Sequence, residues 1–135
     1  MLKRLEVRTT GKTQFVDITT NIRNVLKGEH VTTGLVLAYV PHTTCGITIN
    51  ENADPAVKED IIATLDGLVP RQGEYRHLEG NADAHIKASL MGFDVMLIVE
   101  GGALVLGTWQ GVYLAEFDGP RNRSVLLKII PDPTS

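Results

Sequence analysis

Three of the four histidines, His42, His77 and His85, stand at the edges of expected strands and helices, among carboxylates and amides. Neutral imidazole is the commonest metal-binding side chain, and three imidazoles with one open position allow a divalent ion to polarise water or a phosphate oxygen. The spacing matches no local metal motif, because an expected loop and helix start separate His77 from His85. The three histidines are therefore candidate ligands of a zinc or magnesium ion, with hydrogen-bonded structural histidines as the alternative.

The carboxylates differ in how readily a structural role explains them. Asp54 precedes a proline and is expected to cap a helix, while Asp83 lies in the first turn of another helix, where the dipole favours it. Glu51 has no such role, since it follows directly on an expected strand between Asn50 and Asn52. Glu51 is therefore the candidate general base or metal ligand, with Asn50 as a second catalytic candidate.

A helix expected to begin after Asn81 brings polar groups to a place where an anion can dock. His85, Lys87 and Ser89 lie in its first turns, where unsatisfied N–H groups, the helix dipole and a cation would act together. Lys87 is the candidate catalytic cation and Ser89 a candidate substrate contact. An ordinary solvated lysine is the alternative interpretation.

Two further stretches combine glycine with groups that bind ligands. "LGTWQG" places Trp109, which offers a stacking face, and the Gln110 amide between two glycines that allow close approach. Core packing is the alternative for a lone tryptophan. "EFDGPRNR" gathers Glu116, Asp118, Arg121 and Arg123 around a Gly-Pro turn, which is either a phosphate clamp or a hairpin tip.

Strands with alternating or continuous apolar residues must position these groups. Segments 2–9 and 13–20 alternate around a glycine and predict a β-hairpin. The apolar runs 33–42 and 46–50 predict a central antiparallel pair. Further strands are expected over residues 94–100, 103–117 and 123–130.

Helix signals lie between these strands. Asp54 followed by proline predicts a helix that ends near Gly67, and Asn81 is expected to cap a helix that Gly92 closes. A shorter amphipathic helix is expected from residue 21 to Gly28, and residues 70–80 form a surface loop. Mostly sequential strands with about three helices favour an α+β domain, an antiparallel sandwich or barrel-like sheet.

Composition is that of one ordinary globular domain, expected over residues 1–130, with a frayed tail at 131–135. The formal charge of −3 and the lack of a basic run argue against nucleic acid as a partner. The chain has no apolar stretch long enough for a membrane helix, and its single cysteine, Cys45, suits a reducing compartment. The sequence therefore predicts a cytoplasmic protein without a membrane partner.

Three strings resemble the YjbQ-like family of small proteins, often labelled secondary thiamine-phosphate synthases: "PHTTCGITINENADPAVKED", "HLEGNADAHIKASLMG" and "LGTWQGVYLAEFDGPR". The resemblance implies a compact β-rich α+β fold assembled as a homotrimer, with a pocket at or near the subunit interface. It also implies that the three histidines are the metal ligands. The positions that match the family's motif residues are His42, Thr43, Asn50, Glu51, Asn52, Asp54, Asp60, His77, His85, Lys87, Ser89, Trp109, Gln110 and Glu116.

The family's label implies an enzyme that joins a hydroxymethylpyrimidine diphosphate to a thiazole phosphate and releases pyrophosphate. Lys87, Arg121 and Arg123 would neutralise the diphosphate, and Trp109 would face the pyrimidine. The candidate substrate contacts are Thr43, Asn52, Ser89, Trp109, Gln110, Glu116, Arg121 and Arg123. A metal-dependent hydrolase of a small phosphorylated or ester metabolite is the first alternative, and a non-catalytic metabolite- or metal-binding module is the second.

Overall fold

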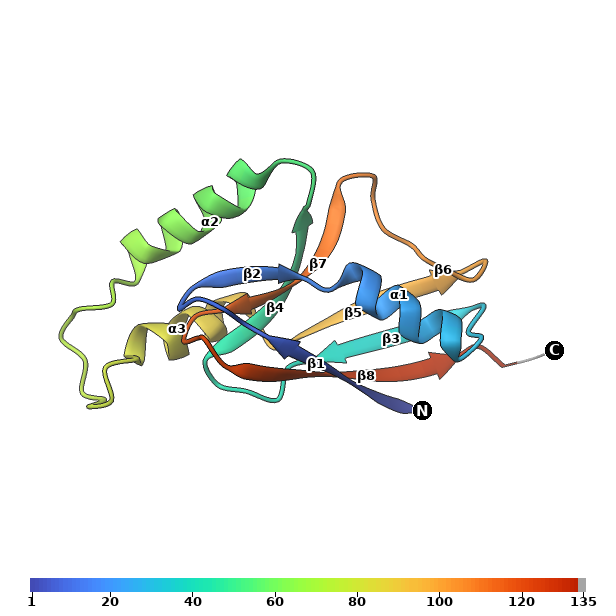
Figure 1. Ribbon diagram of the computed structural model, residues 1–135, viewed down its shortest axis with the longest axis horizontal. Helices are drawn as coiled ribbons and strands as arrows, with labels where there is room; N and C mark the ends of the chain where they lie inside the picture. Colours follow the sequence, from blue (N-terminus) through green and yellow to red (C-terminus); the bar gives the residue numbers. More distant parts are fainter. Residues whose placement is uncertain (134–135) are drawn as a thin grey trace.

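The computed structural model describes residues 1–133, which form eight strands and three helices (Figure 1). In chain order these are β1 (Leu2–Arg8), β2 (Gln14–Asp17), α1 (Thr19–Gly28), β3 (Gly34–Tyr39), β4 (Cys45–Glu51), α2 (Pro55–Leu68), α3 (Ala82–Met91), β5 (Asp94–Glu100), β6 (Ala103–Leu104), β7 (Gln110–Glu116) and β8 (Asn122–Pro131). No helix in the described part of the chain is both long and apolar enough to span a membrane.

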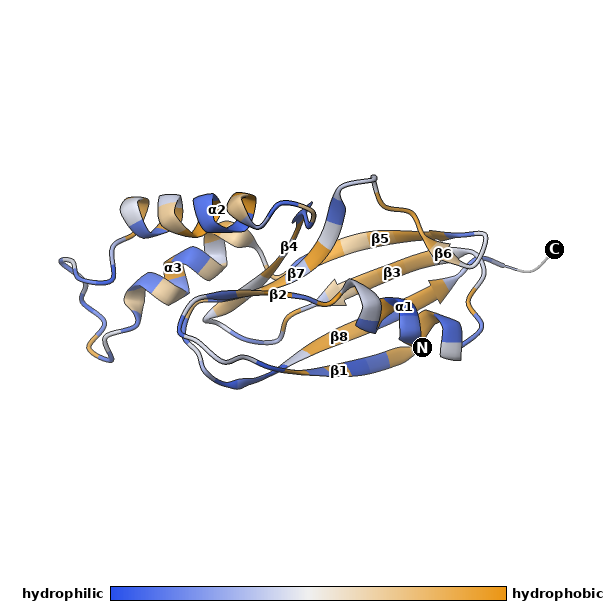
Figure 2. Ribbon diagram, turned by 45° about the horizontal axis from the view of Figure 1, so that its top comes forward, coloured by the Kyte–Doolittle hydropathy of each residue, from blue (hydrophilic) through white to orange (hydrophobic). Residues whose placement is uncertain are grey.

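The strands form two antiparallel sheets, which confirms the α+β expectation. One sheet has the order β1-β8-β3-β5-β6, and the other has the order β2-β7-β4. Side chains such as Val36, Ile47, Leu114 and Leu127 are fully buried and belong to one core cluster, into which α1 inserts Ile22. Figure 2 shows the apolar strands β3, β5 and β8 running side by side through the larger sheet.

Two strand pairings differ from the prediction. β1 and β2 do not form a hairpin, because β1 pairs with β8 and β2 pairs with β7 in the other sheet. β3 and β4 likewise belong to different sheets, since β3 lies between β8 and β5, whereas β4 pairs with β7. Apolar alternation marks which face of a strand is buried, and either pairing buries the same faces.

The strand predicted over residues 103–117 is interrupted. β6 and β7 are separate. The Val105 N–H still donates to the Ile98 carbonyl of β5 at 2.8 Å, but the residues after it leave the sheet and end in a turn in which the Gln110 N–H donates to the Gly107 carbonyl at 3.0 Å. The Gly107 N–H in turn donates to the Gln110 side-chain oxygen at 2.8 Å. Gly107, one of the two glycines that were expected to allow close approach of a ligand, is therefore part of a local turn.

The helix ends follow the sequence closely, with one exception. The Asp54 side chain accepts a hydrogen bond from the Ala56 N–H at 2.9 Å, as expected for a cap, and α2 ends at Leu68. Gly92 ends α3 with φ at +97°, a backbone conformation that favours glycine. Asn81 precedes α3, but its side chain makes no cap hydrogen bond: Nδ2 donates to Asp118, and Oδ1, the atom that would accept from the helix, has no partner among the described residues.

Helices α2 and α3 lie together at the end of the molecule opposite the C-terminus (Figure 1). They cover a second core cluster. It contains Phe15 from β2, Tyr113 from β7 and Phe117 from the turn after β7. The contact is lopsided, because α3 buries five residues whereas α2 buries none completely. Loop 70–80, as predicted, joins the two helices without regular structure.

The C-terminal strand is longer than predicted. β8 runs to Pro131, and the Asp132 N–H donates to the Thr33 carbonyl at 3.0 Å. The expected tail begins inside this strand, and its last two positions, 134–135, lie outside the described residues.

Candidate functional site

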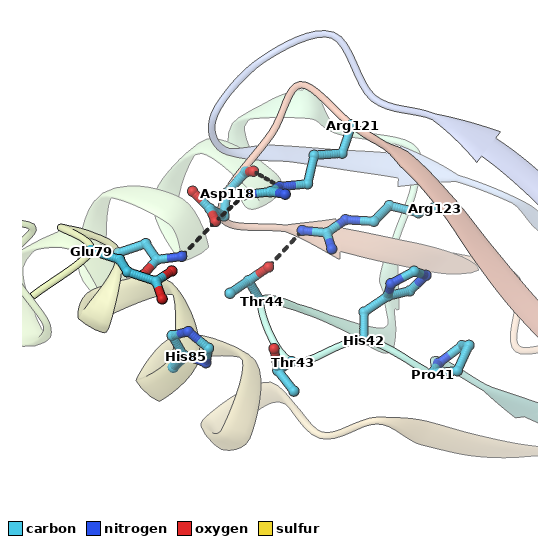
Figure 3. Close-up of a pocket in the computed structure, with 10 residues that line it drawn as sticks. Pro41, His42, Thr43, Thr44, Glu79, His85, Asp118, Arg121 and Arg123 are labelled. Carbon is cyan, nitrogen blue, oxygen red and sulfur yellow. Dashed lines mark hydrogen bonds and ion pairs between the residues drawn. The ribbon is translucent and has the colours of Figure 1, made fainter. Parts of the chain in front are cut away.

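A polar cavity of about 370 Å³ opens where the segment before β4, the start of α3 and the turn between β7 and β8 meet (Figure 3). It is built from three separate parts of the chain, so only the tertiary fold creates it. The lining residues are Pro41, His42, Thr43, Thr44, Glu79, Asn81, His85, Asp118, Arg121 and Arg123.

A buried ion pair supports the cavity from behind. Arg123 donates from Nε and Nη2 to the two Glu116 oxygens at 2.9 and 2.5 Å, and Nη2 also donates to the Thr44 hydroxyl at 2.8 Å. The Thr9 hydroxyl donates to Glu116 at 2.7 Å. Burial alone would raise the pKa of Glu116, but the hydrogen bonds from Arg123 and Thr9 bring it below its ordinary value. Burial also raises the pKa of the neighbouring Cys45 thiol to about 12, so Cys45 is not a nucleophile at neutral pH.

His42 lies beside Arg123 and is fixed through one ring nitrogen. The backbone N–H of Ser124 donates to His42 Nε2 at 2.9 Å. Burial and the Arg123 charge lower the pKa of His42 below its ordinary value. The ring is therefore neutral at pH 7, and the Nε2 lone pair is already used.

Asp118, in the turn after β7, forms another part of the cavity rim and contacts Asn81 at the start of α3. Arg121 donates from Nη2 to Asp118 Oδ2 at 2.8 Å, and the Asn81 amide donates to the same oxygen at 2.8 Å. Asn81 Oδ1 is buried and has no hydrogen-bond partner among the described residues. The hydrogen bond between Asn81 and Asp118 thus holds the N-terminus of α3 against the β7–β8 turn.

His77 and His85 are neighbours, and His42 is not part of their pair. The two rings stand edge to face with centroids 5.2 Å apart, and they share a second cavity of about 280 Å³ with Ala82 and Ile86. Glu79 Oε1 lies 3.8 Å from His77 Nε2.

Within one subunit, the three histidines therefore do not converge on one ion. Within residues 1–133, no group of three or more His, Cys, Asp or Glu side chains is placed to hold a metal ion. The Nε2 lone pair of His42 is also engaged by the backbone. The adjacent His77 and His85 rings supply two nitrogen donors, which is half of a zinc site.

Lys87 does not reach the cavity. Its Nζ is 2.6 Å from Asp66 and 3.3 Å from Asp83, and both Lys87 and Asp83 are buried. Lys12 reaches the same Asp83 oxygen at 3.2 Å. Burial opposes ionisation of Asp83, yet the hydrogen bonds from the two lysines lower its pKa. Ser89 lies on the exposed side of α3 and donates to the His85 carbonyl at 3.0 Å.

The other candidates gather at the far end of the β4–β7 pair. The register pairs Cys45 with Glu116 at the cavity end and Glu51 with Gln110 at the other end. At about 3.3 Å per residue, these ends are about 20 Å apart. Trp109 there is 62% exposed, and the Asn52 side chain covers Gly111. Within one subunit, Asn50, Glu51, Asn52, Trp109 and Gln110 therefore do not line the cavity.

The structure brings together five predicted residues and adds others that the sequence did not single out as ligand-binding. His42, Thr43, His85, Arg121 and Arg123 all line the cavity, and Glu116 supports it. Asp118 of the predicted clamp lines the cavity as well, and the added lining residues are Pro41, Thr44, Glu79 and Asn81. Glu79 stands between two candidate histidines in the sequence, which is a signal that was available. The Asn81–Asp118 contact joins distant segments and left no local signal.

Comparison with known proteins places the whole chain in one group. The sequence profile described as "UPF0047 protein YjbQ-like" matches residues 3–132. A UPF0047 protein of Methanocaldococcus jannaschii is 51% identical over 98% of this chain and 96% of its own length. The UPF0047 protein YugU of Bacillus subtilis is 49% identical over 96% of this chain and 99% of its own.

Solved structures agree with the sequence comparison. An uncharacterised YjbQ/UPF0047 protein of Clostridium acetobutylicum superposes with a TM-score of 0.92 at 51% identity, covering 95% of this chain and 99% of that one. The hypothetical protein APE1520 of Aeropyrum pernix superposes with a TM-score of 0.93 at 34% identity, covering 98% and 99%.

Proposed function

The chain belongs to the UPF0047 (YjbQ-like) family, and on that basis we propose that it is a cytoplasmic enzyme acting on a small phosphorylated metabolite in the cavity of Figure 3. The observation that carries the proposal is the convergence of Arg123, Arg121 and His42 on one polar cavity. Arg123 matters most, because its bidentate bond to Glu116 holds it in place before any ligand arrives. A donor that is already fixed costs no reorganisation when a phosphate binds.

The electrostatics of the cavity limit which phosphate fits. Two arginines line it, but Glu79 and Asp118 do so as well, and Glu116 lies behind Arg123. The charges are therefore close to balanced. A phosphate must bind through hydrogen-bond donors, or it must bring its own cation, as a magnesium diphosphate does. This agrees with a diphosphate substrate better than with a bare dianion.

The reaction that the family's label implies is thiamine phosphate formation. The bond between the pyrimidine methylene carbon and the diphosphate oxygen breaks, and the diphosphate leaves with the electron pair. The thiazole nitrogen then supplies the pair for the new C–N bond. In this proposal Arg121, Arg123 and Thr43 bind the departing diphosphate, and no proton needs to be removed by Glu51.

Incubation of purified protein with the two precursors tests this reaction. Chromatography should detect thiamine phosphate and pyrophosphate in equal amounts. Arg121→Gln should slow turnover, because Arg121 lines the cavity, whereas Arg8→Gln removes an exposed guanidinium away from it and serves as the matched control. A wild-type protein that releases pyrophosphate without forming thiamine phosphate, or that forms neither, contradicts the proposal.

A metal-dependent hydrolase is the second candidate, and the adjacent His77 and His85 rings favour it. A divalent ion bound there would polarise a water molecule or a phosphate oxygen. Because the described residues hold no group of three or more His, Cys, Asp or Glu side chains placed for a metal ion, further ligands must come from the substrate or from another copy of the chain. Turnover of a phosphate or acyl ester panel that chelation abolishes and zinc restores would favour the hydrolase. Tight binding of a metabolite without turnover would favour a binding module.

We further propose that the chain assembles as a homotrimer, as the resemblance implies. The outer face of the larger sheet is apolar where it should be polar if solvent covered it. Leu35 pairs with Ile98 on one side and Ile130 on the other, and all three are exposed, as is Met96. Such a continuous patch is typical of a protein interface.

Assembly would also give the distant candidates a role. A neighbouring copy can bring its Glu51 and Trp109 end to this cavity, which one subunit does not do. Light scattering after size exclusion tests the assembly, with a trimer expected for the wild type and monomer for Ile98→Lys. A matched Arg8→Glu variant should stay trimeric. A monomeric wild-type protein would contradict the proposal.

A further inference from the structure

His42 has a fixed hydrogen-bonding state that can be deduced from its backbone partner. The Ser124 N–H is a donor that cannot act as an acceptor, and it points at His42 Nε2 from 2.9 Å. Nε2 must therefore carry a free lone pair. A neutral imidazole has only one such nitrogen, so the ring proton resides on Nδ1, and an imidazolium is incompatible with this contact.

The proton on Nδ1 is directed at the cavity. Nδ1 has no hydrogen-bond partner within the described chain, yet it is not sealed from solvent. The only side-chain N or O atoms that are both buried and unpartnered in that part of the chain are Asn81 Oδ1 and Asp83 Oδ1. His42 also lines the cavity, so its unsealed Nδ1–H can meet a ligand there.

Arg123 repeats the same arrangement next to His42. Its Nε and Nη2 are committed to Glu116 and Thr44, whereas Nη1 donates none of the hydrogen bonds found in residues 1–133 and is not among the sealed atoms. Figure 3 shows the Arg123 guanidinium above the His42 ring at the same side of the cavity. Both side chains thus have a protein partner behind and an unused N–H in front.

We infer that His42 Nδ1–H and Arg123 Nη1–H form a donor pair that binds one oxyanion of the ligand, and that His42 is not a metal ligand. A metal ion cannot bind Nδ1 while Nε2 accepts the Ser124 N–H, because the neutral ring has one lone pair. Binding at Nε2 would leave the Ser124 N–H without its partner. The identification of the oxyanion as a phosphate rests on the proposed function, whereas the hydrogen-bonding state of His42 does not.

Nitrogen-15 NMR of the histidine rings in the wild-type protein tests this state directly. His42 should show a protonated Nδ1 and an unprotonated Nε2, and Zn²⁺ should move neither these signals nor the Ser124 amide. His77 and His85 serve as internal controls in the same spectrum. A proton on Nε2, or a Zn²⁺-induced shift of His42 together with the Ser124 amide, overturns the assignment.

Two variants then test the Nδ1–H donor and the Nε2 acceptor of the His42 ring separately. His42→Gln places a carbonyl oxygen where Nε2 accepts from Ser124 but removes the Nδ1–H donor. His42→Asn places an amide N–H near Nδ1 but leaves the Ser124 N–H unpaired. One lost hydrogen bond to a charged group corresponds to about tenfold in affinity, so inorganic phosphate should bind about tenfold more weakly to His42→Gln and nearly normally to His42→Asn.

Acetate in a parallel titration distinguishes a carboxylate from a phosphate ligand. If either anion shifts His42 Nδ1 and the Arg123 N–H signals, the donor pair is supported, and the tighter anion names the ligand class. If both leave these signals unmoved, or if His42→Asn loses affinity as His42→Gln does, the donor pair is overturned. Phosphate binding at this pair in a protein that makes no thiamine phosphate would instead refute the proposed reaction alone.

Discussion

The two sides of the cavity are built in opposite ways. The strand wall, formed by residues 41–44 and Arg123, has buried partners such as Glu116 behind its polar groups. The loop wall, formed by Glu79 and His85 with His77 and Leu78 beside them, has none of comparable burial. The side chains of His77 and Glu79 are 41% and 77% exposed, and Leu78 is 95% exposed.

This difference indicates separate tasks for the two walls. Donors fixed before binding contribute most when charge must be stabilised, so the strand wall is suited to hold an oxyanion. The loop wall carries His85 of the imidazole pair and has an exposed leucine next to it, so we expect a ligand, an ion or another copy of the chain to complete it.

Glu116→Gln should be the most damaging change. It removes the negative charge of a fully buried pair and leaves the Arg123 guanidinium buried and uncompensated, which costs about 3–5 kcal/mol of unfolding free energy. Guanidinium denaturation measures the loss. Arg121→Gln is the matched control, because its pair with Asp118 is half exposed and should contribute no more than about 1 kcal/mol. Equal losses for the two variants would mean that the strand wall is not specially supported.

Asp83→Asn should have an intermediate effect, because Asp83 lies on the buried face of α3, the helix that carries His85. The change leaves Lys12 and Lys87 with one counter-charge fewer, but Lys87 keeps Asp66. We expect a loss of about 1–3 kcal/mol, the usual penalty for a buried polar group that loses its partner. Asp66→Asn, on the exposed side of the same lysine, should cost less than about 1 kcal/mol. A larger loss of unfolding free energy for Asp66→Asn would mean that Asp66 of α2, and not Asp83, is the main partner that holds Lys87 and α3 in place.

As the pH is lowered, the unfolding free energy of the protein should fall in two steps, one from His42 and one from Glu116, both in or behind the strand wall. The pKa of His42 is lowered from 6.5 on folding, so its contribution is present above pH 6.5 and is lost as the pH falls toward the folded value. Glu116 has a pKa lowered from 4.5, so its contribution is lost only in more acidic solution. Urea midpoints should therefore decline slightly below pH 6.5 and steeply below about pH 4.5. His42→Gln should remove the first decline and keep the second, and an unchanged first decline would assign it to another histidine.

Local elements of the fold were predictable because their signals are local. Asp54 before proline, Gly92 after α3 and the polar loop 70–80 each act within a few residues, and each was placed correctly. Strand partners were not predictable, because alternation reports the buried face of β1 or β4 and not the strand that lies beside it. The wrong hairpin and the wrong central pair share this cause.

The candidate site shows the same limit. His42, His85 and Arg123 were selected by residue type and do reach the cavity. Glu51 was selected because no structural role was visible for it, yet the register of β4 with β7 carries it to the other end of the strand. Lys87 was selected for its charge, which Asp66 and Asp83 already satisfy. Residue type therefore predicted the chemistry, and tertiary partners decided which groups remain available for it.

Leu78→Ser should be the smallest change to the isolated subunit and the sharpest test of the loop wall. A side chain that is 95% exposed makes few contacts, so the substitution should alter the unfolding free energy of a monomeric Ile98→Lys background by no more than about 0.5 kcal/mol. Leu114→Ala, at a fully buried position, should cost about 2–5 kcal/mol in the same background. In the wild-type background, Leu78→Ser should weaken assembly or metabolite binding if the loop wall is completed from outside, because the leucine then packs against what completes it. A loss of stability in the monomeric background comparable to that of Leu114→Ala would show that the loop wall is already packed within one subunit, and the contrast between the two walls would fail.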